Sequence, residues 1–339
     1  MFANELRYHR LRLPQKWQNT YDTIDVAVRQ MQCSFEINKS QSSVGTQELH
    51  QIFCSVYNDN PSYYYYTPTV CQTEHYSDKF LCHVNYIYSE KQAKEIEQVL
   101  AEFLRDFYKQ HVSRHMKDHE KVMLIHNYLV STVAYDYSAE SGAGEDLDVY
   151  NVLGALLKRR AVCWGISMAF KLLCDYLGVP SLVVLGKSSL DKSEDDHAWN
   201  IVRLGSHFYH VDATWDLRTK GSARHVFDHY NIDDGMMGAV HDWDRQYYPD
   251  CDGYEYNYFY MNNCFVSELG QIGPFLHRRL EQGKSQVLLK YRGDMPENDA
   301  IYREAQSAVA GFCESAGGRG VSWSVSINRE MQNICVVLE

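Results

Sequence analysis

Apolar residues recur at helical spacing, interrupted by short strand-like runs, along the first third of the chain. The pattern predicts helices over 17–32 and 46–61, and strands over 62–70 and 80–89. Four residues form the more apolar face of the second strand: Cys82, Val84, Tyr86 and Tyr88. The first part of the chain is therefore predicted to mix helices with a piece of sheet.

Two further helical patterns follow. Segment 89–112 predicts a long helix with Ser89 as its N-cap. The apolar stripe of this helix is predicted to be Ile96, Val99, Leu100, Phe103 and Phe107. Segment 118–136 predicts another helix, which ends in an acidic, glycine-containing loop over 138–148.

The pattern changes again near the end of the chain. It predicts a strand over 285–291, a helix over 297–317, and strands over 321–328 and 333–339. These elements describe a small α+β unit. We therefore divide the chain into an N-terminal α+β region (1–115), a central core (116–265) and a C-terminal subdomain (266–339).

Composition excludes several classes of function. The net charge of −11 without a strong basic stripe makes nucleic acid an unexpected partner. No apolar run approaches the roughly 20 residues of a membrane helix, and the start of the chain lacks the apolar segment of a secretory signal. The ten cysteines form no C-x-x-C pair. We therefore expect a cytoplasmic protein with mostly buried free thiols.

One cysteine, Cys163, stands apart because of its place in a helix. Six residues after it recur at helical spacing: Ile166, Ala169, Phe170, Leu173, Cys174 and Leu177. Gly178 ends the pattern, so Cys163 is predicted to lie in the first turn. There the free amides and the helix dipole stabilise a thiolate. Cys174 lies deep in the apolar stripe and is predicted to be structural.

A hairpin over 197–216 supplies a possible base. Gly205-Ser206 predicts a type II′ turn, in which the numbers of paired residues sum to 411. His197 and Asp212 then share a face and lie diagonally across from each other. A buried aspartate needs a partner, and an imidazole held at one nitrogen leaves the other free to take a proton from a thiol.

A His–Asp pair in a protein core is often purely structural. The order Cys…His…Asp along the chain nevertheless favours nucleophilic catalysis. Other histidines are less informative. His207 and His210 fall on opposite strand faces, and His225 and His229, although spaced i, i+4, lack a glutamate of a metal-binding helix motif. We expect structural roles for them and no metal site.

The two motifs together resemble the core of the transglutaminase-like superfamily of papain-like thiol enzymes. The closest likeness is to bacterial members related to the kyphoscoliosis peptidases. Seventeen positions carry it: Val162, Cys163, Gly165, Ala169, Phe170, Leu177, Gly178, Gly186, His197, Ala198, Trp199, Asn200, Tyr209, Asp212, Thr214, Trp215 and Asp216. The specific resemblance covers roughly residues 120–216. Many relatives have a polar residue where this chain has Trp164.

The resemblance implies an α+β fold in which a Cys-bearing helix packs on an antiparallel sheet. It implies that Cys163 is the nucleophile, His197 the base and Asp212 the orienter, with Tyr150 and Asn151 in the segment that could supply an oxyanion donor. Trp164 and Trp199 are expected to line the substrate cleft. No calcium-site pattern is present, so we expect no cofactor.

The implied reaction is acyl transfer from a peptide or glutamine amide of a protein substrate through a thioester. We expect hydrolysis, as in a peptidase or deamidase. Transamidating cross-linking and a non-catalytic protein-binding role on the same fold stay open, and the sequence does not indicate an oligomeric state.

Overall fold

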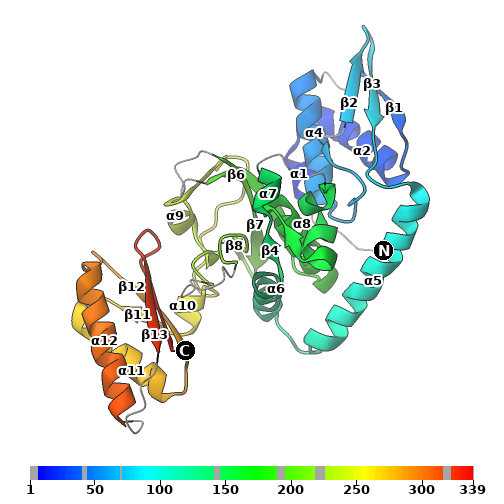
Figure 1. Ribbon diagram of the computed structural model, residues 1–339. Helices are drawn as coiled ribbons and strands as arrows, with labels where there is room; N and C mark the ends of the chain where they lie inside the picture. The colour runs from blue at the N-terminus through cyan, green and yellow to red at the C-terminus, as the bar shows by residue number, and fades with distance from the viewer. Residues whose placement is uncertain are drawn as a thin grey trace.

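The computed structural model describes residues 7–39, 44–68, 71–140, 146–188, 195–217, 226–315 and 322–338. The chain forms an N-terminal unit, a central core and a C-terminal unit, arranged in chain order from one end of the molecule to the other (Figure 1). No helix in the described segments is both long and apolar enough to cross a bilayer.

The central core is a five-stranded antiparallel sheet with a buried helix against it. The sheet has the order β10-β6-β7-β8-β9. Its strands are β6 (Ser181–Ser188), β7 (Asp195–Leu204), β8 (His207–Val211), β9 (Tyr230–Ile232) and β10 (His241–Trp243). Helix α8 (Cys163–Leu177) lies against β6 and β7, and most of its residues are buried. This confirms the predicted α+β class, with a Cys-bearing helix packed on an antiparallel sheet.

Several other elements precede α8 in the core. They are α6 (Asp118–Thr132), α7 (Tyr137–Glu140), the 3₁₀ turn Leu147–Tyr150, the π-helical turn Gly154–Lys158, and the parallel pair β4 (Ala134–Tyr135) and β5 (Arg160–Ala161). After the sheet come α9 (Asp234–Met237) and α10 (Tyr258–Met261). Asn200 on β7 donates to the Ser167 carbonyl, 3.0 Å away, and so ties α8 to the sheet.

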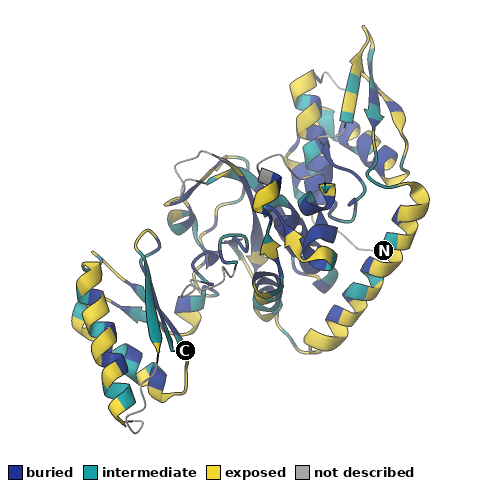
Figure 2. Cartoon of the chain, in the orientation of Figure 1, coloured by how far each residue is buried: buried dark blue, intermediate teal, exposed yellow. Residues whose placement is uncertain are grey.

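The N-terminal unit packs helices against a small sheet. Its helices are α1 (Tyr8–Arg12), α2 (Gln15–Arg29) and α4 (Thr46–Asp59), and its antiparallel sheet has the order β1-β3-β2, with β1 (Ser34–Asn38), β2 (Cys71–His75) and β3 (Lys79–Val84). Helix α5 (Glu90–His111) leads from it to the core and begins at Ser89, which accepts from the Gln92 amide in a capping box, as predicted. Much of α5 is exposed (Figure 2).

The C-terminal unit is a four-stranded sheet with two helices on one face. The sheet order is β11-β12-β14-β13, with β11 (Phe265–Val266), β12 (Gln286–Tyr291), β13 (Trp323–Asn328) and β14 (Asn333–Leu338). Helices α11 (Leu269–Glu281) and α12 (Asn298–Ser315) enclose a separate apolar cluster with it. The unit is joined to the core at Asp228, which accepts from the Asn328 and Asn333 amides, each at 2.6 Å.

Two local predictions were wrong. Segment 62–70 is not a strand where the structure describes it, because its tyrosines reach three different elements. The Tyr63 hydroxyl donates to Asp25, that of Tyr64 to the Ala93 carbonyl and that of Tyr66 to the Phe53 carbonyl. Val99 is 52% exposed, since α5 turns a face centred on Leu100, Leu104 and Phe107 to the protein. The domain boundaries at 115/116 and 265/266 stay predictions.

Candidate active site

Cys163 is the first residue of α8, as the apolar pattern predicts. The helix can begin there because Gly165 leaves room for the 149–151 backbone: a Cβ at Gly165 would stand 2.2 Å from the Val149 carbonyl oxygen. The Cys163 side chain is partly exposed, whereas Cys174 is fully buried. The structure therefore places only the first of these two thiols at the free-amide end of the helix.

The hairpin of β7 and β8 has the predicted register; His197 lies on β7, and Asp212 directly follows β8. Leu204 pairs with His207 and Val202 with Tyr209, so paired numbers sum to 411. Gly205 has a φ of 64°, which the first position of a type II′ turn requires. Because the register holds, both side chains fall on one face of the hairpin.

The three residues are joined by hydrogen bonds. His197 Nε2 lies 2.7 Å from Asp212 Oδ2, and the His197 side chain is also hydrogen-bonded to the Cys163 thiol. Since Nε2 faces the carboxylate, Nδ1 is the nitrogen left for the thiol. Oδ1 of Asp212 accepts from the backbone amides of Thr214 at 2.9 Å and Trp215 at 3.2 Å. The carboxylate is thus fixed on both oxygens.

Burial and charge act in opposite directions on this pair. Burial lowers the pKa of His197, but the Asp212 charge and hydrogen bond, with the contact to Cys163, outweigh it and raise that pKa to about 10. Burial raises the pKa of Asp212, but His197 and His241 together hold it well below its ordinary value. Near neutral pH the arrangement therefore holds an imidazolium between a carboxylate and a thiol.

A second histidine, His241 on β10, also binds Asp212. Its Nε2 lies 3.1 Å from Oδ2, the oxygen that His197 uses. Strand β10 pairs with β6, where Trp243 lies opposite Gly186. A Cβ at Gly186 would stand 2.4 Å from the Asp242 carbonyl oxygen, so this glycine lets β10 approach. His241 was not predicted from the sequence; the signal was Gly186, whose need for space is visible only once β10 is paired with β6.

Two groups of side chains could in principle hold a metal: His197, Asp212 and His241, and His210, Asp234 and Cys251. In both groups, hydrogen bonds account for the short distances between the side chains. In the first group, both imidazoles use Nε2 on one carboxylate oxygen. In the second, His210 Nδ1 accepts from the Trp199 indole, so the Nε2 proton goes to Asp234 at 2.8 Å. Coordination by that Nε2 would need an Nδ1 proton, which the indole N–H opposes.

The candidate oxyanion residues differ from each other. Both amide protons of Asn151 are used, one by the Tyr64 carbonyl and one by Asp148 Oδ1, each at 3.1 Å. The side-chain amide of Asn151 is therefore not free to donate to an oxyanion, and it holds the 148–153 turn together. That its segment supplies an oxyanion donor stays a prediction. Tyr150 is partly exposed and packs beside Val149 and Val162 at the start of α8. Its position keeps it as a candidate.

The two candidate cleft tryptophans, Trp199 and Trp164, differ in their exposure. Trp199 was expected to line a substrate cleft, and this is wrong: it is 1% exposed, because its ring fills the space beneath His197 at a centroid distance of 5.9 Å. Trp164 is partly exposed, donates to Asn58 Oδ1 at 2.8 Å and meets the Tyr57 ring edge-on. Helix α4 therefore fixes the side chain next to the nucleophile.

Comparison with protein-family models matches residues 105–213 to the transglutaminase-like superfamily. The central part of the chain is therefore similar to that superfamily. A comparison with curated proteins found no match. The match includes Cys163, His197 and Asp212, so the transglutaminase-like segment contains all three residues joined above.

Two solved structures are also similar to the chain. One is described as a TGase, with 16% identity and a TM-score of 0.27 over 45% of this chain and 46% of that one. The other is a candidate cysteine protease from Cytophaga hutchinsonii, with 14% identity and a TM-score of 0.26 over 42% of this chain and 61% of that one. The chain thus covers less than two thirds of either protein. The transglutaminase-like assignment rests on the family match and on the motifs.

Proposed function

We propose that the protein is a thiol acyl-transfer enzyme that acts on an amide of a protein or peptide. The observation that carries this proposal is His197, which bridges the Cys163 thiol and the ionised Asp212 at the N-terminal end of α8. This arrangement can hold a thiolate beside an imidazolium, which is the reactive state of a cysteine nucleophile.

The first half-reaction forms the thioester. The Cys163 sulfur bonds to the carbonyl carbon, and the oxyanion lies at the free amides of the first turn of α8, with Tyr150 as a further candidate donor. The C–N bond then breaks as the His197 imidazolium gives its proton to the leaving amine. Asp212 keeps the ring oriented throughout.

The second half-reaction releases the acyl group. Neutral His197 takes a proton from water or from an amine, which attacks the thioester and breaks the C–S bond. Water gives hydrolysis, and an amine gives transamidation. We rank hydrolysis first. A cytoplasmic location and the lack of a nucleic-acid partner remain predictions from composition.

Mass spectrometry of a glutamine-containing peptide library tests the proposal. We expect cleavage or a deamidation mass shift that Cys163→Ala abolishes and Cys174→Ala keeps, because only Cys163 contacts His197. Adding a fluorescent primary amine separates the acceptors, since incorporation of the amine identifies transamidation. If no peptide changes and no acyl group is trapped on Cys163, the protein is a binding member of the superfamily instead.

A further inference from the structure

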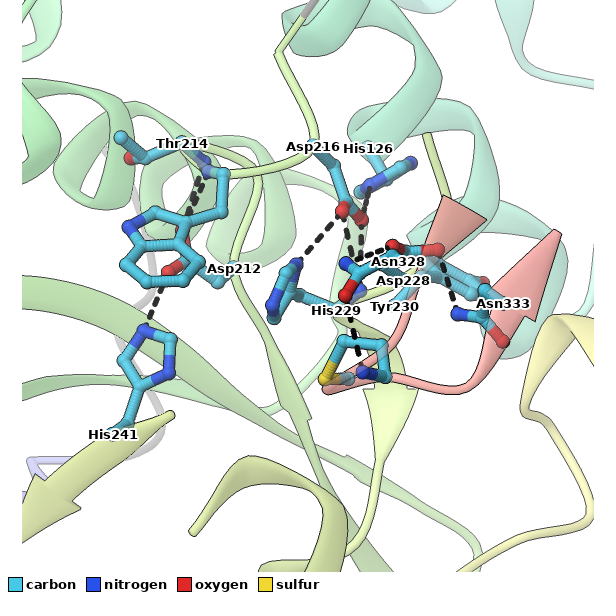
Figure 3. A network of polar contacts seen from close by, with 12 residues as sticks. His126, Asp212, Thr214, Asp216, Asp228, His229, Tyr230, His241, Asn328 and Asn333 are labelled. Carbon is cyan, nitrogen blue, oxygen red and sulfur yellow. Dashed lines mark hydrogen bonds and ion pairs between the residues drawn. The ribbon is translucent and has the colours of Figure 1, made fainter. Parts of the chain in front are cut away.

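The carboxylate of Asp212 has every acceptor position filled. An ionised carboxylate offers about four lone-pair positions. Two on Oδ1 accept from the Thr214 and Trp215 amides, and two on Oδ2 accept from His197 and His241. Figure 3 shows Asp212 between Thr214 and His241, which approaches from β10. The second imidazole is more than orientation requires, because the two amides already fix the carboxylate plane.

The protonation state of His241 follows from its surroundings. Asp212 is ionised and can only accept, so Nε2 of His241 carries a proton. Nδ1 is buried and has no hydrogen-bond partner among the described residues, so a proton there would be unsatisfied. Burial is the main cause that lowers the pKa of His241, to about 4. His241 is therefore neutral near pH 7.

Among the groups that face His241, Asp212 raises its pKa by hydrogen bond and charge, and burial outweighs this effect. Asp212 accepts its proton, while His197 and His229 lie with ring centroids at 5.3 and 5.9 Å and oppose a second positive charge. The remaining rings against it are Trp199 and Trp215, at 5.0 and 4.6 Å. His241 thus acts as a fixed neutral donor, buried between the Asp212–His197 pair and the rings of Trp199 and Trp215.

We propose that His241 is a positioning residue whose hydrogen bond moderates the negative charge of Asp212. The site then consists of four linked residues, Cys163, His197, Asp212 and His241, rather than a triad. This inference rests on the proposed function for its role in turnover. A donor on Oδ2 draws negative charge away from the His197 contact. The imidazolium is then stabilised enough to pair with a thiolate but remains acidic enough to protonate a leaving amine.

Titration of His197 by NMR tests the proposal without any need for activity. The variants are made in the full-length Cys163→Ala protein, and the His197 ring signals are followed against pH. His241→Phe keeps a ring but removes the donor, and we expect the His197 midpoint to rise by about one unit, the size of a charge-assisted hydrogen bond. His241→Gln keeps an N–H at the Nε2 position and should restore the parent midpoint.

His210→Gln is the matched control. It also removes a buried histidine bound to an aspartate, but His210 bonds Asp234 and Trp199 and not Asp212. We expect no change in the His197 midpoint. If His241→Phe loses its folded circular dichroism spectrum, His241→Ala takes its place in the titration.

An unchanged or lower His197 midpoint in the donor-less variant overturns the role of His241. So does an equal shift in His241→Gln, because a purely structural effect would not distinguish a retained donor from a lost one. If the midpoint rises as expected but Cys163 proves unreactive, the proposed function fails and the influence of His241 on the His–Asp pair stands. In an active protein, turnover by His241→Phe should fall severalfold at pH 7, with rescue by His241→Gln.

Discussion

Two buried aspartates that lie four residues apart in the chain, Asp212 and Asp216, each bind two histidines. Asp212 binds His197 and His241 through one oxygen, at 2.7 and 3.1 Å. Asp216 binds His126 Nε2 through Oδ2 at 3.0 Å and His229 Nδ1 through Oδ1 at 3.1 Å. Figure 3 shows Asp216 with its two histidines, and Asp212 with His241. In residue types and burial they are nearly alike.

The difference lies in what the histidines face. His197 contacts the thiol at the start of α8. His126 packs against the Phe227 and Tyr230 rings, at centroid distances of 5.5 and 4.9 Å. Within the described residues neither His126 nor His229 is hydrogen-bonded to a thiol. A buried His–Asp contact alone is therefore no sign of catalysis; the cysteine at the start of α8 is what distinguishes the candidate active site from the Asp216 cluster.

Replacing each aspartate by asparagine should give the largest difference between the two clusters, in the rate of acyl transfer. Asp212→Asn should lower the rate of acyl transfer about 10²-fold or more, because His197 loses both its orientation and its charge partner. Asp216→Asn should leave the rate of the folded protein within a few-fold. Its effect should be on stability, about 3 kcal/mol, from an unpaired buried cluster. Equal losses of rate, measured on protein shown to be folded, would remove the distinction.

The next largest effect is expected on stability, from a substitution where the 149–151 backbone lies close to α8. Gly165→Ala should lower the free energy of unfolding by about 1–3 kcal/mol, because the new Cβ would overlap the Val149 carbonyl. Gly270→Ala, in α11, is the control, since its Cβ would meet nothing within 4 Å. It should be neutral or slightly stabilising. Urea unfolding checks both, and equal behaviour of the two variants would contradict the close approach.

The pH dependence of stability distinguishes the histidines of the Asp212 cluster. The pKa of His241 is lowered to about 4, so the unfolded chain binds its proton first and stability is lost as pH falls below about 6.5. Between pH 7 and pH 5 this loss is about 2 kcal/mol, and His241→Gln should remove it. His197 acts oppositely: its pKa is raised to about 10, so its stabilisation persists at low pH and is lost as pH rises through that value. An unchanged acid-side loss in His241→Gln would refute the first assignment.

Local sequence was enough to predict the parts of the site that depend on neighbours in the chain. Helical spacing placed Cys163 at the first turn, and the Gly205-Ser206 turn fixed the register that joins His197 to Asp212. Both results depend on short-range geometry: the helix period and the two-residue alternation of a strand.

Residues brought together over long distances in the chain could not be predicted in this way. His241 reaches Asp212 because β10 adds to β6, and His126 reaches Asp216 from α6, 90 residues earlier in the chain. The tyrosines of segment 62–70 failed as a strand for the same reason, since their hydroxyls bind distant carbonyl and carboxylate groups. Tertiary hydrogen bonds decided these positions, and a periodic pattern does not contain them.

Alkylation of individual cysteines by iodoacetamide at pH 7 tests the central claim most directly. Cys33 is exposed and serves as an ordinary thiol within the same molecule. We predict that Cys163 reacts about 100-fold faster than Cys33, and that His197→Ala brings the two rates together. Equal rates for Cys163 and Cys33 in the unaltered protein would contradict the assignment of Cys163 as an activated nucleophile.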